Sequence, residues 1–413
     1  MLWMQPIDDP FACDGGLLLL DHALDRLRRL LGVVTEVETV PVDQALRRVL
    51  AADHASPLAV PAFDCSAMDG WAVRGADLGA DPLPIGAATI AAGHPLTTPA
   101  APGLAYRIFT GAPIPAGLDT VVVMEAAREL GDRVVLPPSR PGANIRRAGE
   151  SVAVGDCPLH AGTVLGPAHL GVAAMLGLIA LPVRRPLRVA VVSTGDEVCD
   201  PGTPLPEGGL YDANRACLKA MLTAQGCAVT DLGILADRPA VLEAVLGAAA
   251  ADHDLIVTSG GASVGGEDHL RAAVAALGRV AVWRHAVKPG KPLLVGQIGR
   301  ATLLGLPGNP VAVVVGYLLI GREVVAALTG ASPPVIQRQS RPAAFSLSKP
   351  AGRREFPRVR LDETGAVHLF RTDSSGVLTS VTACDGLLDL PEAGIEIRPG
   401  DPVAFIPFSE VMP

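Results

Sequence analysis

Hydrophobic residues change their spacing along the chain, and each change predicts a different kind of structure. In residues 17–31, leucines recur at helical spacing with Asp and Arg opposite, which is typical of an amphipathic helix. We expect further short helices over residues 42–52 and 168–176. Between residues 57 and 140, short β-prone runs alternate with clusters of Pro and Gly, which predicts a compact β-rich domain inserted into its neighbour.

From residue 186 onward, buried strand-like runs alternate with helical segments, which is typical of a doubly wound α/β domain. We expect strands within residues 187–197, 229–235, 254–261, 280–287 and 302–306, and helices within residues 211–226, 240–251, 268–277 and from 310 to 328. Residues 335–413 contain short strands and turns, which predict a small β-barrel or sandwich.

These patterns predict a multidomain fold of the α/β plus β class. The central domain is doubly wound α/β, and it is joined by an inserted β-rich domain, a C-terminal small β-barrel and a mixed α/β N-terminal domain. The predicted boundaries are 1–56 together with 141–185 for the mixed domain, 57–140 for the insertion, 186–331 for the α/β domain and 332–413 for the barrel.

Composition narrows the functional classes. The net charge of the 413 residues is −8, and no basic block indicates a nucleic-acid partner. Seven cysteines without a CxxC pair fit a reducing cytoplasm, and no Cys/His spacing typical of zinc is evident. The first residues carry acids where a signal peptide carries positive charge, and the longest apolar runs look too short to span a bilayer. We therefore expect a cytoplasmic protein with no membrane partner.

Three loops near residues 259–310 carry the candidate chemistry. In an open α/β sheet, ligands bind at the carboxyl ends of the strands, where such loops lie. The first loop would offer backbone N–H groups, the second two ammonium groups, and the third a helix N-terminus. Their residues are Ser259, Gly260, Gly261 and Ser263; Lys288 and Lys291; and Pro307 and Pro310. The loops predict an oxyanion and phosphate site, although the same Gly and Pro would also suit ordinary tight turns.

Carboxylates follow several of the same strands. Glu197 follows one strand, Asp237 ends the next, and Asp268 lies after the glycine-rich loop. Carboxylates beside a phosphate site are typical ligands of Mg²⁺, although Asp268 could instead cap a helix. In the inserted domain, Asp69 precedes a glycine and Thr110 lies on a Gly-Pro turn. Each could face a ligand or simply stabilise its turn.

Eight motifs occur in an order that resembles one family. They are PAFDCSAMDGWAVR, RIFTGAPIPAG, NIRRAGE, VVSTGDE, YDANR, SGGASVGGEDH, KPGKP and LPGNP. The chain resembles the molybdopterin molybdenumtransferase family of the MoeA type, which is related to the E domain of gephyrin. The resemblance runs from about residue 17 to the C-terminus. It implies four domains, with the mixed N-terminal domain serving dimerisation in an elongated homodimer.

The resemblance also implies an activity and its residues. Molybdate would be inserted into adenylylated molybdopterin with Mg²⁺, releasing AMP and molybdenum cofactor, in a cleft between the α/β domain of one subunit and the β-rich domains of the other. The family's functional positions correspond to Asp69, Thr110, Glu197, Asp237, Asp268, Lys288, Lys291, Pro307, Pro310, Arg358 and Ser375. Asp69 would act in hydrolysing the adenylate. The molybdopterin adenylyltransferase is a candidate protein partner.

Four positions depart from the family pattern: Cys65, Ser151, Arg284 and Ala312. Ser151 replaces an acid, so no carboxylate role is expected there. Two other readings stay open at this point. One is an adenylyltransferase-like nucleotide enzyme, which the extra β-rich domains disfavour. The other is a scaffold that uses the same fold, which the lack of a long linker disfavours. The sequence does not distinguish molybdate from tungstate.

Overall fold

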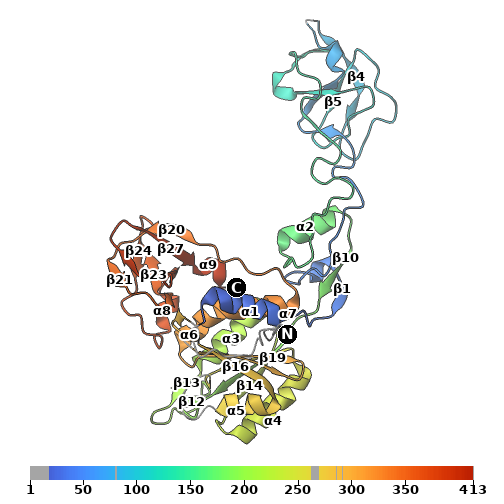
Figure 1. The fold of residues 1–413 in the computed structure, drawn as a ribbon. Helices are drawn as coiled ribbons and strands as arrows, with labels where there is room; N and C mark the ends of the chain where they lie inside the picture. Colours follow the sequence, from blue (N-terminus) through green and yellow to red (C-terminus); the bar gives the residue numbers. More distant parts are fainter. Residues whose placement is uncertain (1–17, 80, 262–268, 285, 291, 413) are drawn as a thin grey trace, which may run out of the picture.

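The computed structural model describes residues 18–79, 81–261, 269–284, 286–290 and 292–412. A body holds the α/β sheet and the C-terminal strands, and an arm extends from it to a separate β-rich module that carries β4 and β5 (Figure 1). The inserted sequence thus forms a unit far from the α/β sheet of its own chain.

The body is built on a six-stranded sheet in the order β14-β11-β15-β19-β18-β16. All of these strands point the same way except β18, which is antiparallel to both of its neighbours. They are β11 (Arg188–Thr194), β14 (Ala228–Leu235), β15 (Leu255–Ser259), β16 (Gly278–Arg284), β18 (Pro292–Ile298) and β19 (Ala301–Leu306). The alternation of strand and helix predicted the parallel part correctly. It missed β18, so the sheet is mixed.

Helices cover both faces of this sheet. The helices α4 and α5 pack with Leu242, Leu246 and Leu270 on one face, and α1, α3, α6 and α7 form the larger core on the other. Their bounds are α1 (Leu20–Leu30), α3 (Ala213–Ala224), α4 (Pro239–Asp252), α5 (His269–Leu277), α6 (Pro310–Gly316), the π-helical segment η4 (Tyr317–Gly321) and α7 (Arg322–Thr329). Each predicted helix of this domain is present, with ends within a few residues of those expected.

The continuous helix Pro310–Thr329 is long and apolar enough to cross a membrane by length and composition. The expectation that the apolar run here is too short was therefore wrong, because the helix continues past Ile320. Its apolar window is 83% buried, however, and Val313, Tyr317 and Leu318 pack in the core of the α/β sheet. Burial of this kind is typical of a core helix.

The N-terminal module pairs β1 (Val37–Pro41) with β10 (Ala180–Arg184) and carries η1 (Val42–Gln44) and α2 (Pro167–Met175). The predicted helix over residues 42–52 is wrong. After η1, Arg47 adopts a positive φ of 62°, and the amide of Leu50 then donates to Thr163 O. Because backbone amides in this stretch bond to other segments, the chain after η1 is extended, like a strand, and not helical.

The helix α1 contributes little to this module. Leu20, Ala23 and Leu27 are buried in the core that covers the α/β sheet, and Arg28 pairs with Glu323 of α7 at 2.8 Å. The apolar face of this helix therefore needs no second subunit, because α7 covers it within the chain.

The inserted module contains a six-stranded sheet in the order β6-β3-β5-β4-β8-β7. Its strands are β3 (Gly70–Val73), β4 (Leu83–Ile90), β5 (Ala105–Ile108), β6 (Thr120–Val123), β7 (Arg128–Leu130) and β8 (Arg133–Val135), with β2 (Cys65–Ser66) and β9 (Ile145–Arg146) paired beside it and short turns at η2 (Gly75–Asp77) and η3 (Met124–Ala126). Trp71 and Ile108 are fully buried on opposite faces, in two separate small cores. The module therefore has its own packing.

The C-terminal part is mainly β-structure, with the sheet order β20-β27-β25-β23-β24. Its elements are β20 (Gln339–Pro342), β21 (Leu347–Lys349), β22 (Arg354–Glu355), β23 (Arg358–Leu361), β24 (Val367–Leu369), α8 (Thr379–Thr382), β25 (Gly386–Leu388), β26 (Ile395–Ile397), β27 (Pro402–Pro407) and α9 (Phe408–Val411). The strand β22 pairs with β17 (Val287–Lys288), and β12 (Val198–Cys199) pairs with β13 (Leu210–Tyr211). The pair β17–β22 joins the C-terminal part of the chain to the loop that carries Lys288.

The buried carboxylate of Asp254 should make folding stability depend on acid pH. Burial alone would raise its pKa, but hydrogen bonds from Arg185 and Arg188 lower the pKa to about 2. A depressed pKa stabilises the fold fully above the unfolded value near 3.9, and this stabilisation is lost as pH falls toward 2. We therefore expect Asp254→Asn to cost about 2 kcal/mol more unfolding free energy at about pH 6 than at about pH 2.

Urea unfolding of both proteins at the two pH values measures this difference. The matched control is Asp252→Asn, which changes an exposed carboxylate at the end of α4 and should cost little unfolding free energy in either measurement. An equal cost of Asp254→Asn at both pH values would contradict the prediction.

Candidate functional site

Polar atoms without partners gather at the carboxyl-end rim of the central sheet. Buried oxygens of five side chains accept and donate no hydrogen bond among the described residues: Ser193, Thr194, Asn214, Asp237 and Thr258. Two of them end β11, one lies in β15, one follows β14, and Asn214 begins α3. Buried polar atoms are normally paired, so their concentration at one rim indicates a place for a polar ligand or an ion.

The first predicted loop makes a tight turn directly above this rim. Gly260 and Gly261 have φ values of 88° and 67°, which residues other than glycine rarely adopt. A Cβ on Gly260 would lie 2.5 Å from Thr194 O, so only glycine fits there. The turn therefore brings backbone close to the end of β11. Ser263 lies outside the described residues.

Asn214 ties this first loop to the third. Its Nδ2 donates to Ser259 Oγ at 2.8 Å and to Gly308 O at 2.7 Å, while its Oδ1 is buried without a partner. Sequence reasoning did not assign Asn214 to the site. The motif YDANR was the available signal, because it places an asparagine in the first turn of a helix whose N-terminus faces the rim.

The second loop packs against the third. A Cβ on Gly290 would lie 3.5 Å from Ala312 Cβ and 3.6 Å from Pro307 Cγ. Pro310 begins α6, and its neighbour Val311 donates its amide to Ser375 O. The structure thus brings all three predicted loops together, with Ser375 beside them. Lys291 lies outside the described residues.

Lys288 forms ion pairs with two carboxylates of the C-terminal part. Its Nζ lies 2.8 Å from Asp373 Oδ2 and 3.4 Å from Glu355 Oε2. The hydrogen bond to Asp373 is the main cause of a raised pKa, so the ammonium stays charged at neutral pH. A loop of the C-terminal part therefore holds this cation at the rim.

Arg358 builds that C-terminal loop. The residue is only 2% exposed, and its guanidinium donates to Ser380 Oγ at 2.9 Å and to the carbonyl oxygens of Thr372, Asp373 and Ser374. Burial lowers its pKa. Since each nitrogen already donates within the protein, Arg358 positions Asp373 and Ser375. Direct contact with an anion stays a prediction.

The carboxylates at the rim suit a hard cation. Glu197 is exposed and its carboxylate lies against Gly195, while Asp237 Oδ1 is buried without a donor among the described residues. These residues follow β11 and β14, which are adjacent and in register near Thr194 and Leu235. A buried carboxylate oxygen without a donor is costly unless a cation lies nearby. Asp268 lies outside the described residues.

The inserted module carries a separate part of the candidate site. Asp69 Oδ1 accepts from the amide of Thr110 at 2.7 Å and from its hydroxyl at 2.8 Å. The backbone hydrogen bond is the main reason that the pKa of Asp69 is lowered. The structure therefore brings these two predicted residues together, and the carboxylate is ionised at neutral pH.

Exposed apolar side chains are adjacent in sequence to this pair. Met68 is 44% exposed and Phe109 is 37% exposed, and they directly precede Asp69 and Thr110. Phe63 on the same segment is 48% exposed. Exposed aromatic and Met side chains around an ionised carboxylate are typical of a surface that a partner or ligand covers. Sequence reasoning missed these three residues.

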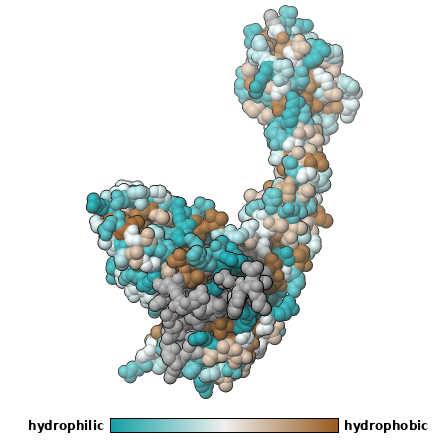
Figure 2. All heavy atoms as spheres, viewed as in Figure 1, coloured by the Kyte–Doolittle hydropathy of each residue, from teal (hydrophilic) through white to brown (hydrophobic). Residues whose placement is uncertain are grey.

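The two parts lie apart within one chain. The rim belongs to the body, whereas Asp69 and Thr110 belong to the module at the end of the arm (Figure 1). Figure 2 likewise shows the arm module projecting away from the body. A second chain would be needed to place an Asp69–Thr110 pair over a rim in this conformation.

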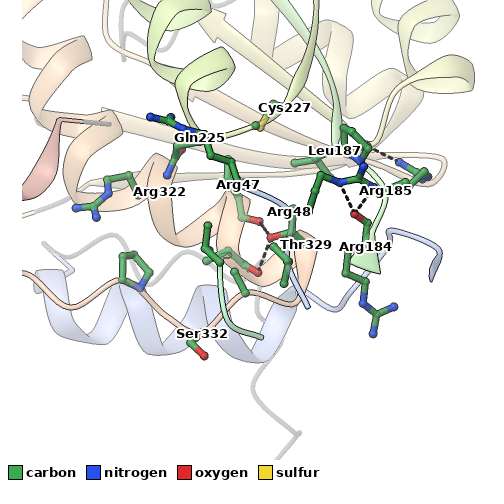
Figure 3. Close-up of a pocket in the computed structure, with 18 residues that line it drawn as sticks. Arg47, Arg48, Arg184, Arg185, Leu187, Gln225, Cys227, Arg322, Thr329 and Ser332 are labelled. Carbon is green, nitrogen blue, oxygen red and sulfur yellow. Dashed lines mark hydrogen bonds between the residues drawn. The ribbon is translucent and has the colours of Figure 1, made fainter. Parts of the chain in front are cut away.

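A cavity of about 220 Å³ lies elsewhere, between the N-terminal module and the α/β sheet (Figure 3). Arginines line it, but Arg48 donates to Arg184 O and Arg185 pairs with Asp254. In Figure 3 the guanidinium groups of Arg184 and Arg322 point outward from the ring of lining residues. We do not assign the cavity to the functional site, because it contains none of the rim residues.

Asn214→Ala should loosen the rim while leaving the fold intact. The change removes both Nδ2 hydrogen bonds and leaves Ser259 Oγ and Gly308 O without this donor, at a cost of about 1–3 kcal/mol to local structure. Hydrogen exchange at the Gly260 amide should become faster. The control is Asn309→Ala, because the Asn309 side chain makes no capping hydrogen bond. Equal exchange in both variants would show that Asn214 does not hold the loops.

Comparison with known proteins identifies the family. Three family descriptions match in order: the MoeA N-terminal region (domain I and II) over residues 18–177, a probable molybdopterin binding domain over 190–327, and the MoeA C-terminal region (domain IV) over 340–408. A solved MoeA protein of molybdopterin biosynthesis from Pyrococcus horikoshii OT3 is 25% identical with a TM-score of 0.82, covering 95% of this chain and all of that chain.

Curated relatives agree with these matches. A molybdopterin molybdenumtransferase of Haemophilus influenzae is 36% identical over 96% of this chain and its own full length. Molybdopterin molybdenumtransferase 2 of Mycobacterium tuberculosis is 39% identical over 88% of this chain and 93% of its own length. Since the relatives and the three regions span the whole arrangement of body and arm, the chain belongs to the molybdopterin molybdenumtransferase family.

Proposed function

We propose that the chain inserts molybdate into adenylylated molybdopterin, with Mg²⁺ and release of AMP, at a site shared by two subunits. Family membership makes it a molybdopterin molybdenumtransferase, an enzyme of molybdenum cofactor biosynthesis. The adenylylated substrate, the magnesium ion and the homodimer are the parts we propose. The concentration of partnerless polar atoms at the rim carries the proposal most directly.

The rim suits two anions that must approach each other. Molybdate and a phosphate group both carry negative charge, and their approach is costly unless cations are already in place. Lys288 is held there by Asp373, and the glycine turn at Gly260 brings backbone close to the rim. Ser259 and Asn214 add polar atoms beside them. These groups can hold oxyanions without a protein nucleophile.

Magnesium would be held by Glu197 and Asp237, together with Asp268 from the loop outside the described residues. The partnerless Oδ1 of Asp237 supports this assignment. Mg²⁺ prefers one or two carboxylates together with phosphate oxygens and water. When bound, the ion would neutralise the phosphate charge of the adenylate.

Asp69 would act on the adenylate from the other subunit. Thr110 engages Oδ1 with two hydrogen bonds, while Oδ2 accepts no hydrogen bond from the residues that the structure describes. An ionised Oδ2 can accept a hydrogen bond from a water and orient it toward the phosphate. Thr110 fixes the carboxylate, so its own role is positioning.

The N-terminal module offers the apolar surface that a homodimer needs. Ile179 is 87% exposed, and Val37, Leu46, Val164 and Met175 are each more than 40% exposed. Met175 and Ile179 lie in an apolar stretch of the sequence, residues 170–183. Single exposed apolar residues are ordinary, but several on one small module favour an interface.

The proposed compartment is the cytoplasm. Six cysteines lie within the described residues, and all are free thiols. A reducing compartment keeps thiols in this state. The molybdopterin adenylyltransferase remains our proposed protein partner, since it would supply the adenylylated substrate.

Complementation between two inactive variants should test the shared site. We expect Asp69→Asn and Glu197→Gln each to abolish AMP release from adenylylated molybdopterin in the presence of molybdate and Mg²⁺. Co-expression should restore about one quarter of the wild-type rate, because about half of the dimers are mixed and each mixed dimer has one intact site of two. Purification with a different tag on each chain confirms that mixed dimers form. Mixed dimers that remain inactive would place the whole site within one chain, and an active Asp69→Asn protein would make Asp69 a turn residue.

Lys288→Ala should weaken anion binding more than stability. Its ion pair with Asp373 is partly exposed and worth at most about 1 kcal/mol to folding. A charged hydrogen bond to bound molybdate is worth about 1.5–3 kcal/mol, so affinity should fall roughly ten- to a hundred-fold, and less in high salt. Calorimetric titration with molybdate measures the change.

The matched control is Lys219→Ala. Lys219 is similarly exposed and pairs with Asp231 at 2.5 Å, near the outer edge of the same sheet. Its removal should leave molybdate affinity unchanged. An unchanged affinity in Lys288→Ala as well would place the anion elsewhere on the rim.

A further inference from the structure

Two chain segments connect the N-terminal module to the inserted module, and they run antiparallel to each other. The bridges His54↔Leu159 and Val60↔Val152 mark the two ends of this connection. Between them, the amide of Ser56 donates to Asp156 O at 2.7 Å. The orientation of the arm thus depends on a narrow two-segment connector, defined here as residues 53–60 and 152–160.

Three metal-ligating side chains meet at the base of this connector. One ligand atom each from Asp53, Cys157 and His160 lies within 4.8 Å of the others. Cys157 Sγ is 3.5 Å from His160 Nδ1, which in turn is 3.7 Å from Asp53 Oδ1. The three side chains come from both segments, 104 positions apart in sequence, which explains why spacing along the chain did not reveal the cluster.

Two of the three separations match the edges of a tetrahedral zinc site. With Zn–S near 2.3 Å, Zn–N near 2.05 Å and Zn–O near 2.1 Å, tetrahedral angles give edges of about 3.6 Å for S···N and about 3.4 Å for N···O. The observed distances of 3.5 Å and 3.7 Å lie within about 0.3 Å of these values. The third separation, between the ligand atoms of Cys157 and Asp53, is at most 4.8 Å and would close to about 3.6 Å on binding.

The surrounding backbone already holds the ligands. Asp53 Oδ1 accepts from the amide of Ala161 at 2.8 Å, and the amide of His54 donates to Leu159 O at 2.8 Å. The thiol of Cys157 donates to the same Leu159 carbonyl at 3.4 Å. Second-shell hydrogen bonds of this kind orient ligands and raise affinity. The side chains of Asp53 and His160 are 68% and 67% exposed, so an ion can enter and a water can complete the tetrahedron.

We propose that Asp53, Cys157 and His160 bind a divalent ion of the zinc class, with water as the fourth ligand. On binding, the Cys157 thiol releases its proton to solvent and the thiolate sulfur bonds to the ion. The thiolate selects zinc over Mg²⁺, which prefers oxygen ligands. The ion would clip the two segments of the connector together and stiffen the base of the arm.

Tag-free protein should bind one equivalent of Zn²⁺ in calorimetric titration with Mg²⁺ in excess, since Mg²⁺ occupies oxygen sites such as the rim. Cys157→Ser keeps the size and the hydrogen bond to Leu159, but it should lower Zn²⁺ affinity by at least about 100-fold. His160→Gln should do the same. Cys384→Ser removes a comparable partly exposed thiol from the C-terminal part and should leave affinity unchanged.

Two further readouts locate the ion. Co²⁺ should give a thiolate-to-metal charge-transfer band in the wild type and in Cys384→Ser, and none in Cys157→Ser. Zn²⁺ should slow hydrogen exchange at the amides of His54 and Ser56 in the wild type and in Cys384→Ser, but not in Cys157→Ser. The proposal is overturned if the wild type binds no Zn²⁺ under these conditions, or if Cys157→Ser retains wild-type affinity. Neither result depends on AMP release, so the proposed function is tested separately.

Discussion

The carboxylate of Asp254 holds together the segments that join the N-terminal module to the central sheet. It accepts two hydrogen bonds from Arg185, which also pairs with Glu36 near β1, and it accepts the backbone amide of Arg188 at the start of β11. One buried charge therefore fixes the linker, the first strand and the neighbouring strand β15 at their common end. The position of the N-terminal module relative to the sheet depends on this junction, and the connector to the inserted module continues from that module.

The far end of that sheet is organised in the opposite way. At one end, the buried carboxylate of Asp254 is paired with two arginines, whereas at the rim several buried oxygens have no partner among the described residues. Asn214 and the Arg358-braced loop hold the rim in shape without filling those positions. The Asp254 end of the sheet thus has a paired carboxylate that contributes to stability. The rim has unpaired polar groups that can bind a ligand, as expected for an open α/β fold.

Sequence patterns predicted the elements whose apolar spacing decides their structure. The helices around the sheet and the strands β11, β14, β15 and β19 are examples. The glycines of the first loop also predicted a turn that only glycine can make. Prediction failed where long-range pairing overrides local spacing, as at residues 42–52, whose amides bond to other segments. Contacts between distant residues, such as Asn214 with Gly308 or Arg358 with the 372–374 loop, leave no periodic signal, so their roles emerged only from the fold.

The buried helix Pro310–Thr329 has a consequence for how the chain is made. Taken alone, these 20 residues are apolar enough to enter a lipid bilayer, and they would be a hazard if they left the ribosome without a partner. They follow β19, however, so every strand of the central sheet has already been synthesised when the helix emerges. The order of elements along the chain therefore supplies the apolar surface before the segment that must cover it, which limits the time that this helix spends exposed.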